Sequence, residues 1–133
     1  MNNEYLEFLK TKIKNVTESG FEINESELNS NLFDFQKFIV KTALKKGKYA
    51  IFADCGLGKT LMQLEFANQC NKQTNMPSLI LCPLAVSGQT IQEGSKFGIE
   101  VNRYDNKSNI QICNYEQIEN IDCSQFGCIV LDE

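Results

Sequence analysis

The chain has 133 residues, the size of one ordinary domain, and its composition of 42% hydrophobic and 23% charged residues is typical of a globular protein. Thirteen basic against seventeen acidic residues give a net charge of −4, and Arg103 is the only arginine, so composition argues against a freestanding domain that binds nucleic acid through a general positive field. No apolar run approaches the roughly 20 residues that cross a bilayer and no signal-peptide pattern opens the chain, so we expect no membrane contact and a cytoplasmic location.

The cysteines do not follow a metal-binding or disulfide pattern. No two of the six have CxxC spacing and the chain has no histidine, which argues against the usual zinc sites. We therefore expect free, buried thiols in a reducing compartment.

The first thirty residues read as an extension. Residues 2–19 place apolar side chains at helical spacing and Gly20 follows as a stop signal, which predicts an amphipathic helix. The polar stretch 24–31 lacks periodicity and reads as a connector. We predict a helical extension over residues 1–30, interpreted as a cover for a sheet edge rather than a docking element, and a domain over residues 31–133.

The rest of the chain alternates between helical and strand patterns. A helix is expected from Asp34, taken as the N-cap, to a cationic last turn and Gly47. Helices are also expected over 59–70 and 86–97, with a short one capped by Asn114. Such alternation predicts an α/β domain with a parallel sheet and right-handed crossovers. The expected strands are 49–53, 78–82, 100–104, 110–113 and 128–131.

A glycine-bearing loop lies between the first expected strand and the helix after it. Residues 53–60 read ADCGLGKT, and Ala53 stands where the usual GxxxxGK[ST] pattern has its first glycine. Backbone N–H groups at such a turn suit a polyphosphate, since glycine permits close approach and the helix start carries partial positive charge. The alternative is a chance GxGKT in a turn. The candidate ATP-binding residues are Gly56, Leu57, Gly58, Lys59, which would reach the β- and γ-phosphates, and Thr60, whose hydroxyl would ligate Mg²⁺.

This loop resembles motif I of superfamily-two helicases, most closely the Swi/Snf-type and the phage or prophage DEAD/DEAH-like members. Gln36, about one helix upstream, matches the family's Q motif, whose glutamine reads the adenine edge; taken alone, it could be a solvated helix residue. The resemblance covers about residues 30–133. It implies a P-loop NTPase fold, the first RecA-like lobe of an ATP-driven motor.

The last residues resemble motif II, the Walker B element. An expected strand over 128–131 ends in Asp132 and Glu133. The resemblance implies that Asp132 holds the hydrated Mg²⁺ and that Glu133 orients the attacking water, which makes Lys59 and Glu133 the candidate catalytic residues. An acidic pair at a chain end, taken alone, is usually a solvated terminus.

Two further segments resemble nucleic-acid-contacting motifs of the same family. Residues 81–89 are similar to motif Ia, and residues 114–116 to a TxxNYE-like segment. The resemblance implies sequence-independent contacts with the phosphates of double-stranded DNA. A Pro turn and an Asn N-cap are equally common as purely structural devices. The candidate contacts are Pro83, Ser87, Gln89 and Asn114.

The resemblance also implies parts that this sequence does not contain. The family's motor has a second RecA-like lobe, whose arginine finger completes the ATP site and accounts for about 10³ to 10⁵ in rate. The family's sheet also has a strand after motif II, between the Walker A and Walker B strands. We therefore expect a sheet that is incomplete at the C-terminus, and a chain that alone binds ATP weakly and hydrolyses it slowly, if at all.

Two other classes of protein fit part of the pattern. A P-loop kinase would share Lys59 and Thr60 but would not need Gln36 or a strand-terminal acidic pair. A module that binds nucleotide, or only a partner protein, without turnover would suit the single-arginine composition.

Overall fold

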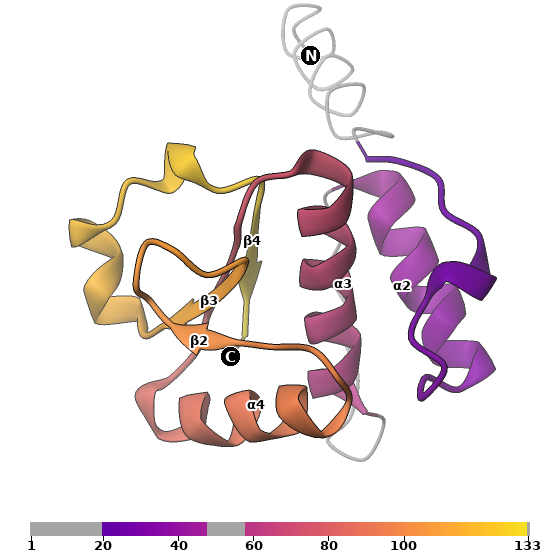
Figure 1. The fold of residues 1–133 in the computed structure, drawn as a ribbon, viewed down its shortest axis with the longest axis horizontal. Helices are drawn as coiled ribbons and strands as arrows, with labels where there is room; N and C mark the ends of the chain where they lie inside the picture. The colour runs from indigo at the N-terminus through magenta and orange to yellow at the C-terminus, as the bar shows by residue number, and fades with distance from the viewer. Residues whose placement is uncertain (1–19, 48–57, 133) are drawn as a thin grey trace, which may run out of the picture.

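The computed structural model describes residues 20–47 and 58–132, which form an α/β fold around a four-stranded, all-parallel sheet (Figure 1). The strand order is β2-β3-β1-β4, so the expectation of a parallel α/β sheet is confirmed. The elements are the 3₁₀ helix η1 (Glu25–Glu27), α2 (Asp34–Lys46), α3 (Lys59–Thr74), β1 (Ser78–Leu81), α4 (Leu84–Lys96), β2 (Asn102–Arg103), β3 (Ile110–Cys113), the 3₁₀ helices η3 (Tyr115–Asn120) and η4 (Cys123–Gln125), and β4 (Cys128–Leu131).

The two central strands are buried along their whole length. All four residues of β1 and all four of β3 are buried, as expected for strands covered on both faces. The pairing register aligns Ser78 with Ile110 on one side and with Cys128 on the other. The Ser78 hydroxyl also donates to the carbonyl of Ala67, 2.7 Å away, which ties the start of β1 to α3.

The two faces of the sheet pack against different segments of the chain. Alternate strand residues, including Ile80 and Ile112, pack with side chains of α2, α3 and α4 in the larger core. The opposite side chains, including Leu79 and Cys113, pack with Phe126 and others from the segment that holds η3 and η4. Figure 1 shows α3 between α2 and the sheet, and the 3₁₀ segment on the other side.

β4 lies at one end of the strand order and packs against the larger core with one face only. Cys128 and Val130 pack against the larger core, whereas Ile129 and Leu131 are 41% and 66% exposed. The strand expected over 49–53 lies outside the described residues, as does the helix expected over 2–19.

α2 begins one residue earlier than expected. Asp34 was predicted to be its N-cap, but the cap position is Phe33, whose backbone N–H donates to the side-chain Oε1 of Gln36 at 2.8 Å. The buried amide of Gln36, at the third helical position, therefore satisfies the backbone N–H of the N-cap residue, whereas Asp34 was predicted to accept from an N–H inside the first turn. The predicted glycine stop is confirmed, since Gly47 has φ of 76° and donates to the carbonyl of Ala43.

The connector before α2 packs into the larger core. Ile23, Leu28 and Leu32 are buried there, and the backbone N–H of Asn29 donates to the buried carboxylate of Glu65 on α3. Side chains on both sides of the predicted boundary at residue 30 thus share one core. None of the helices in the described ranges combines the length and the apolar character needed to cross a bilayer.

Candidate nucleotide site at the carboxyl edge of the sheet

The candidate residues gather at one edge of the sheet. Because all four strands run the same way, their carboxyl ends lie together, at Arg103, Cys113, Leu81 and Leu131. In open α/β sheets, ligands bind in the crevice outside these carboxyl ends.

Lys59 and Asp132 form an ion pair at this edge. The Lys59 Nζ lies 3.3 Å from Asp132 Oδ1, with the lysine side chain 36% and the aspartate side chain 15% exposed. Lys59 is the first residue of α3, and Asp132 follows β4 directly, with its backbone N–H donating to the carbonyl of Leu81 at 2.8 Å. The fold thus brings together two residues that are 73 positions apart in the sequence.

Gln36 lies against the glycine that precedes α3. Gly58 is in the left-handed region with φ of 71°, and a Cβ built on it would lie 2.1 Å from Gln36 Nε2. Gln36 is only 3% exposed. The residues predicted to meet the base and the phosphates are therefore neighbours, although the observed role of the Gln36 oxygen is to cap α2.

The predicted metal ligands offer the right donor chemistry for magnesium. Thr60 follows Lys59 on α3, and Asp132 already faces a cation, the Lys59 ammonium. Mg²⁺ binds oxygen and is usually held by one or two carboxylates together with substrate phosphates. An all-protein cage is not required, and no group of three His, Cys, Asp or Glu side chains that could hold a metal occurs among the described residues.

Three predicted site residues cannot be placed. Gly56 and Leu57 of the loop and Glu133 of the acidic pair lie outside the described residues. Their roles remain predictions from the sequence.

The predicted nucleic-acid contacts differ in accessibility. Pro83, the N-cap residue of α4, and Gln89 are exposed. Ser87 is 2% exposed, and its hydroxyl donates to the carbonyl of Leu84 at 2.9 Å. Asn114 is the N-cap of η3, as expected, and its side chain accepts from the backbone N–H of Gln117 at 3.0 Å.

Tyr115 connects this segment with Asp132, the described acidic residue of the candidate site. Its hydroxyl donates to the backbone carbonyl of Asp132 at 2.5 Å. Tyr115 was not among the predicted site residues, because a single tyrosine after an N-cap carries no sequence signal for a contact 17 residues away.

Cys82 follows β1 directly, and the charges of both Asp132 and Arg103 act on its thiol. Burial raises the pKa of the Cys82 thiol and the charge of Asp132 raises it further, whereas the charge of Arg103 lowers it. Among the described cysteines, Cys70, Cys82 and Cys113 are buried free thiols, and Cys123 and Cys128 are partly buried.

The sequence was compared with models of known protein families and with curated proteins, and neither comparison found a match.

Proposed function

We propose that this chain is the ATP-binding part of a nucleic-acid-dependent ATPase, a helicase or translocase motor of the superfamily-two type. The observation that carries the proposal is the 3.3 Å contact between Lys59 and Asp132 at the carboxyl edge of the sheet. A lysine at a glycine-preceded helix start, facing a carboxylate at the end of a strand, matches what a Mg²⁺-triphosphate needs.

Each candidate residue has one role in binding ATP and Mg²⁺ or in hydrolysis. Lys59 binds the β- and γ-phosphates, and Thr60 and Asp132 hold Mg²⁺, which neutralises charge on the phosphates when it is bound. Glu133 orients the attacking water. Gln36 lies beside Gly58 and is assigned to the adenine. That contact favours the motor over a P-loop kinase, which would not need this glutamine.

Nucleotide binding by residues 1–133 tests the first half of the proposal. A fluorescent ATP analogue should bind in the presence of Mg²⁺, and Lys59→Ala should weaken binding by about tenfold or more, because a charge-assisted contact is lost. Lys72→Ala removes an exposed cation from the last turn of the same helix and should leave binding unchanged. Equal binding by the parent chain and Lys59→Ala would refute the site.

The motor itself is tested by hydrolysis in a polypeptide in which this chain is followed by a second RecA-like lobe. Adding DNA should accelerate hydrolysis, and Lys59→Ala and Glu133→Gln should each abolish it. Equal rates with and without DNA indicate a simple ATPase. Phosphate transfer to a small acceptor indicates a kinase, and binding without turnover indicates a nucleotide-binding module.

A further inference from the structure

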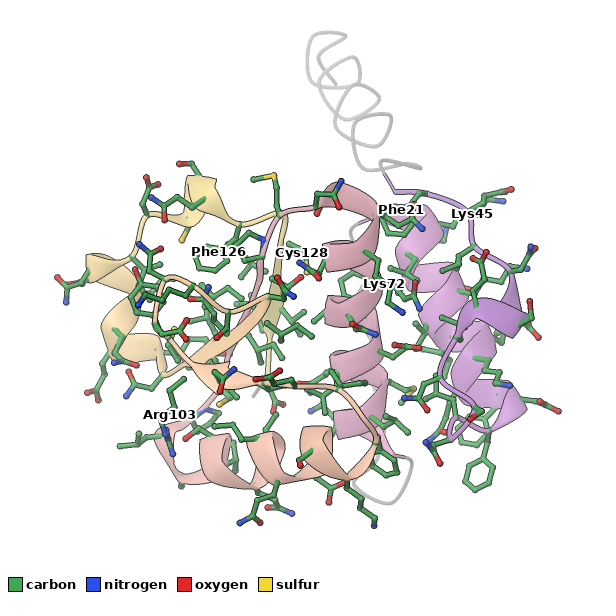
Figure 2. All side chains as sticks on the ribbon, viewed as in Figure 1. Phe21, Lys45, Lys72, Arg103, Phe126 and Cys128 are labelled. Carbon is green, nitrogen blue, oxygen red and sulfur yellow. The ribbon has the colours of Figure 1, made fainter. Side chains whose placement is uncertain are left out.

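The only arginine of the chain lies beside a predicted nucleic-acid contact. Arg103 ends β2, and its Nη1 donates to the hydroxyl of Ser87 at 2.9 Å. A Cβ built on the adjacent Gly88 would lie 3.9 Å from Arg103 Nη2. Figure 2 shows Arg103 beside the N-terminal part of α4.

Ser87 is poorly placed to contact a nucleic acid through its own side chain. It is 2% exposed, its hydroxyl proton is directed to the Leu84 carbonyl, and its oxygen accepts from Arg103. The buried Ser87 hydroxyl thus uses its proton as a donor and a lone pair as an acceptor within the protein. It holds the guanidinium of Arg103, whose side chain is exposed.

Arg103 has the properties of an anion-binding group. Its side chain is exposed, it forms no ion pair with another described residue, and its guanidinium donates to the neutral hydroxyl of Ser87. A guanidinium has five N–H donors, and the bond to Ser87 uses one of them. The remaining donors and the full charge are suited to the planar, bidentate recognition of phosphate.

The strand order separates Arg103 from the nucleotide site. β2 and β4 lie at opposite ends of the order β2-β3-β1-β4, three strand spacings apart. At about 4.8 Å per spacing, the backbone of Arg103 lies about 14 Å from β4, which Asp132 follows. This separation leaves room for Arg103 to bind a phosphate of a second ligand while a triphosphate occupies the site at Lys59.

We propose that Arg103 is a contact for a nucleic-acid backbone phosphate and that Ser87 positions its guanidinium. This inference rests on the proposed function and assigns part of the nucleic-acid side to a residue outside the predicted contacts. Within the proposed function, one positioned guanidinium at this edge of the sheet supplies a localised cationic contact on a chain whose net charge is −4.

The test measures binding of residues 1–133 to a fluorescent DNA duplex of about 20 base pairs over a range of salt concentrations. Arg103→Gln should weaken binding about tenfold at low salt and reduce the slope of log K against log salt by about 1, uniformly across DNA sequences. Lys72→Gln removes the same charge from the far end of α3 and should change neither quantity. Affinity for the ATP analogue should be the same in all three chains.

Ser87 has its own test as a positioning residue. Ser87→Ala should weaken DNA binding several-fold in the parent chain and have no further effect in the Arg103→Gln background. A general structural defect caused by Ser87→Ala would instead weaken DNA binding in both backgrounds. Unfolding curves establish that each variant is folded.

Each outcome separates the inference from the proposed function. If Arg103→Gln leaves DNA binding unchanged, the inference is overturned and the proposed ATP site is unaffected. The same holds if the parent chain binds ATP but does not bind DNA. A loss of ATP affinity in Arg103→Gln assigns the arginine to the nucleotide and also overturns the inference. A parent chain that binds neither ligand overturns the proposed function itself.

Discussion

The Lys59 ammonium lies 3.3 Å from the carboxylate of Asp132, which joins the start of α3 to the end of β4. The two side chains belong to elements that do not adjoin in the chain, so the contact depends on the parallel arrangement of the sheet and on the packing of α3 against β1 and β4.

Asp132→Asn should uncouple nucleotide binding from magnesium. The amide removes the negative charge that faces Lys59 and would hold Mg²⁺, so the affinity for ATP should no longer rise when Mg²⁺ is added. A fluorescent ATP analogue titrated with and without Mg²⁺ measures this. Asp122→Asn, at the cap of η4, is the matched control and should retain the Mg²⁺ effect; a Mg²⁺ effect that persists in Asp132→Asn contradicts the assignment.

Gly58→Ala should destabilise the chain and weaken ATP binding. A Cβ at φ of 71° is strained and would also lie 2.1 Å from Gln36 Nε2. Left-handed backbone costs a non-glycine residue about 1–2 kcal/mol, and displacing the buried amide adds to this cost.

Gly98→Ala separates these two causes. Gly98 has φ of 78°, but a Cβ there meets nothing within 4 Å. The free energy of unfolding should fall by about 1–2 kcal/mol in Gly98→Ala and by more in Gly58→Ala, and only Gly58→Ala should lose ATP affinity. Equal losses of stability in urea unfolding would show that Gln36 moves aside freely.

Gln36→Ala should lower the free energy of unfolding by about 1–2 kcal/mol, because the backbone N–H of Phe33 loses its acceptor at the start of α2. If the amide also reads adenine, the preference for ATP over GTP should disappear. Gln73→Ala, at an exposed position in the last turn of α3, is the control for both measurements. An unchanged ATP preference would restrict Gln36 to its capping role.

Asp105 should titrate at unusually low pH. The Ser108 hydroxyl and backbone N–H, together with the Lys107 N–H, donate to its carboxylate and lower its pKa to about 2. Because the folded-state pKa lies below the unfolded value of about 3.9, the stabilisation is fully present above about pH 4 and is lost as the pH falls through about 2.

Ser108→Ala should raise the pKa of Asp105 toward its ordinary value, as measured by an NMR titration of the carboxyl group. Asp122 is an internal control, because Ser124 lowers its pKa in the same way and is far from the substitution in the sequence. A shift of both carboxyl groups would point to a general loss of structure instead.

Sequence-based reasoning was most accurate where structure depends on neighbouring residues. The glycine stop at Gly47 and the cap at Asn114 were predicted from local signals, and both are present. The buried strand β1 was predicted from its continuous apolar run, and it lies between two partners. By contrast, Asp34 was assigned the cap of α2 because Asp is a favoured N-cap residue. The sequence carries no signal that the long side chain of Gln36 folds back onto Phe33.

Within the described residues, the sequence by itself determined where most helices and strands lie and which residue types could serve a Mg²⁺-triphosphate, because backbone preferences and hydrophobic periodicity act over a few residues. Only the tertiary structure decided that Lys59 meets Asp132, that Ser87 is buried and that Arg103 lies upon it. Strand order sets these contacts, and it results from burying both faces of the sheet at once, which depends on residues throughout the chain.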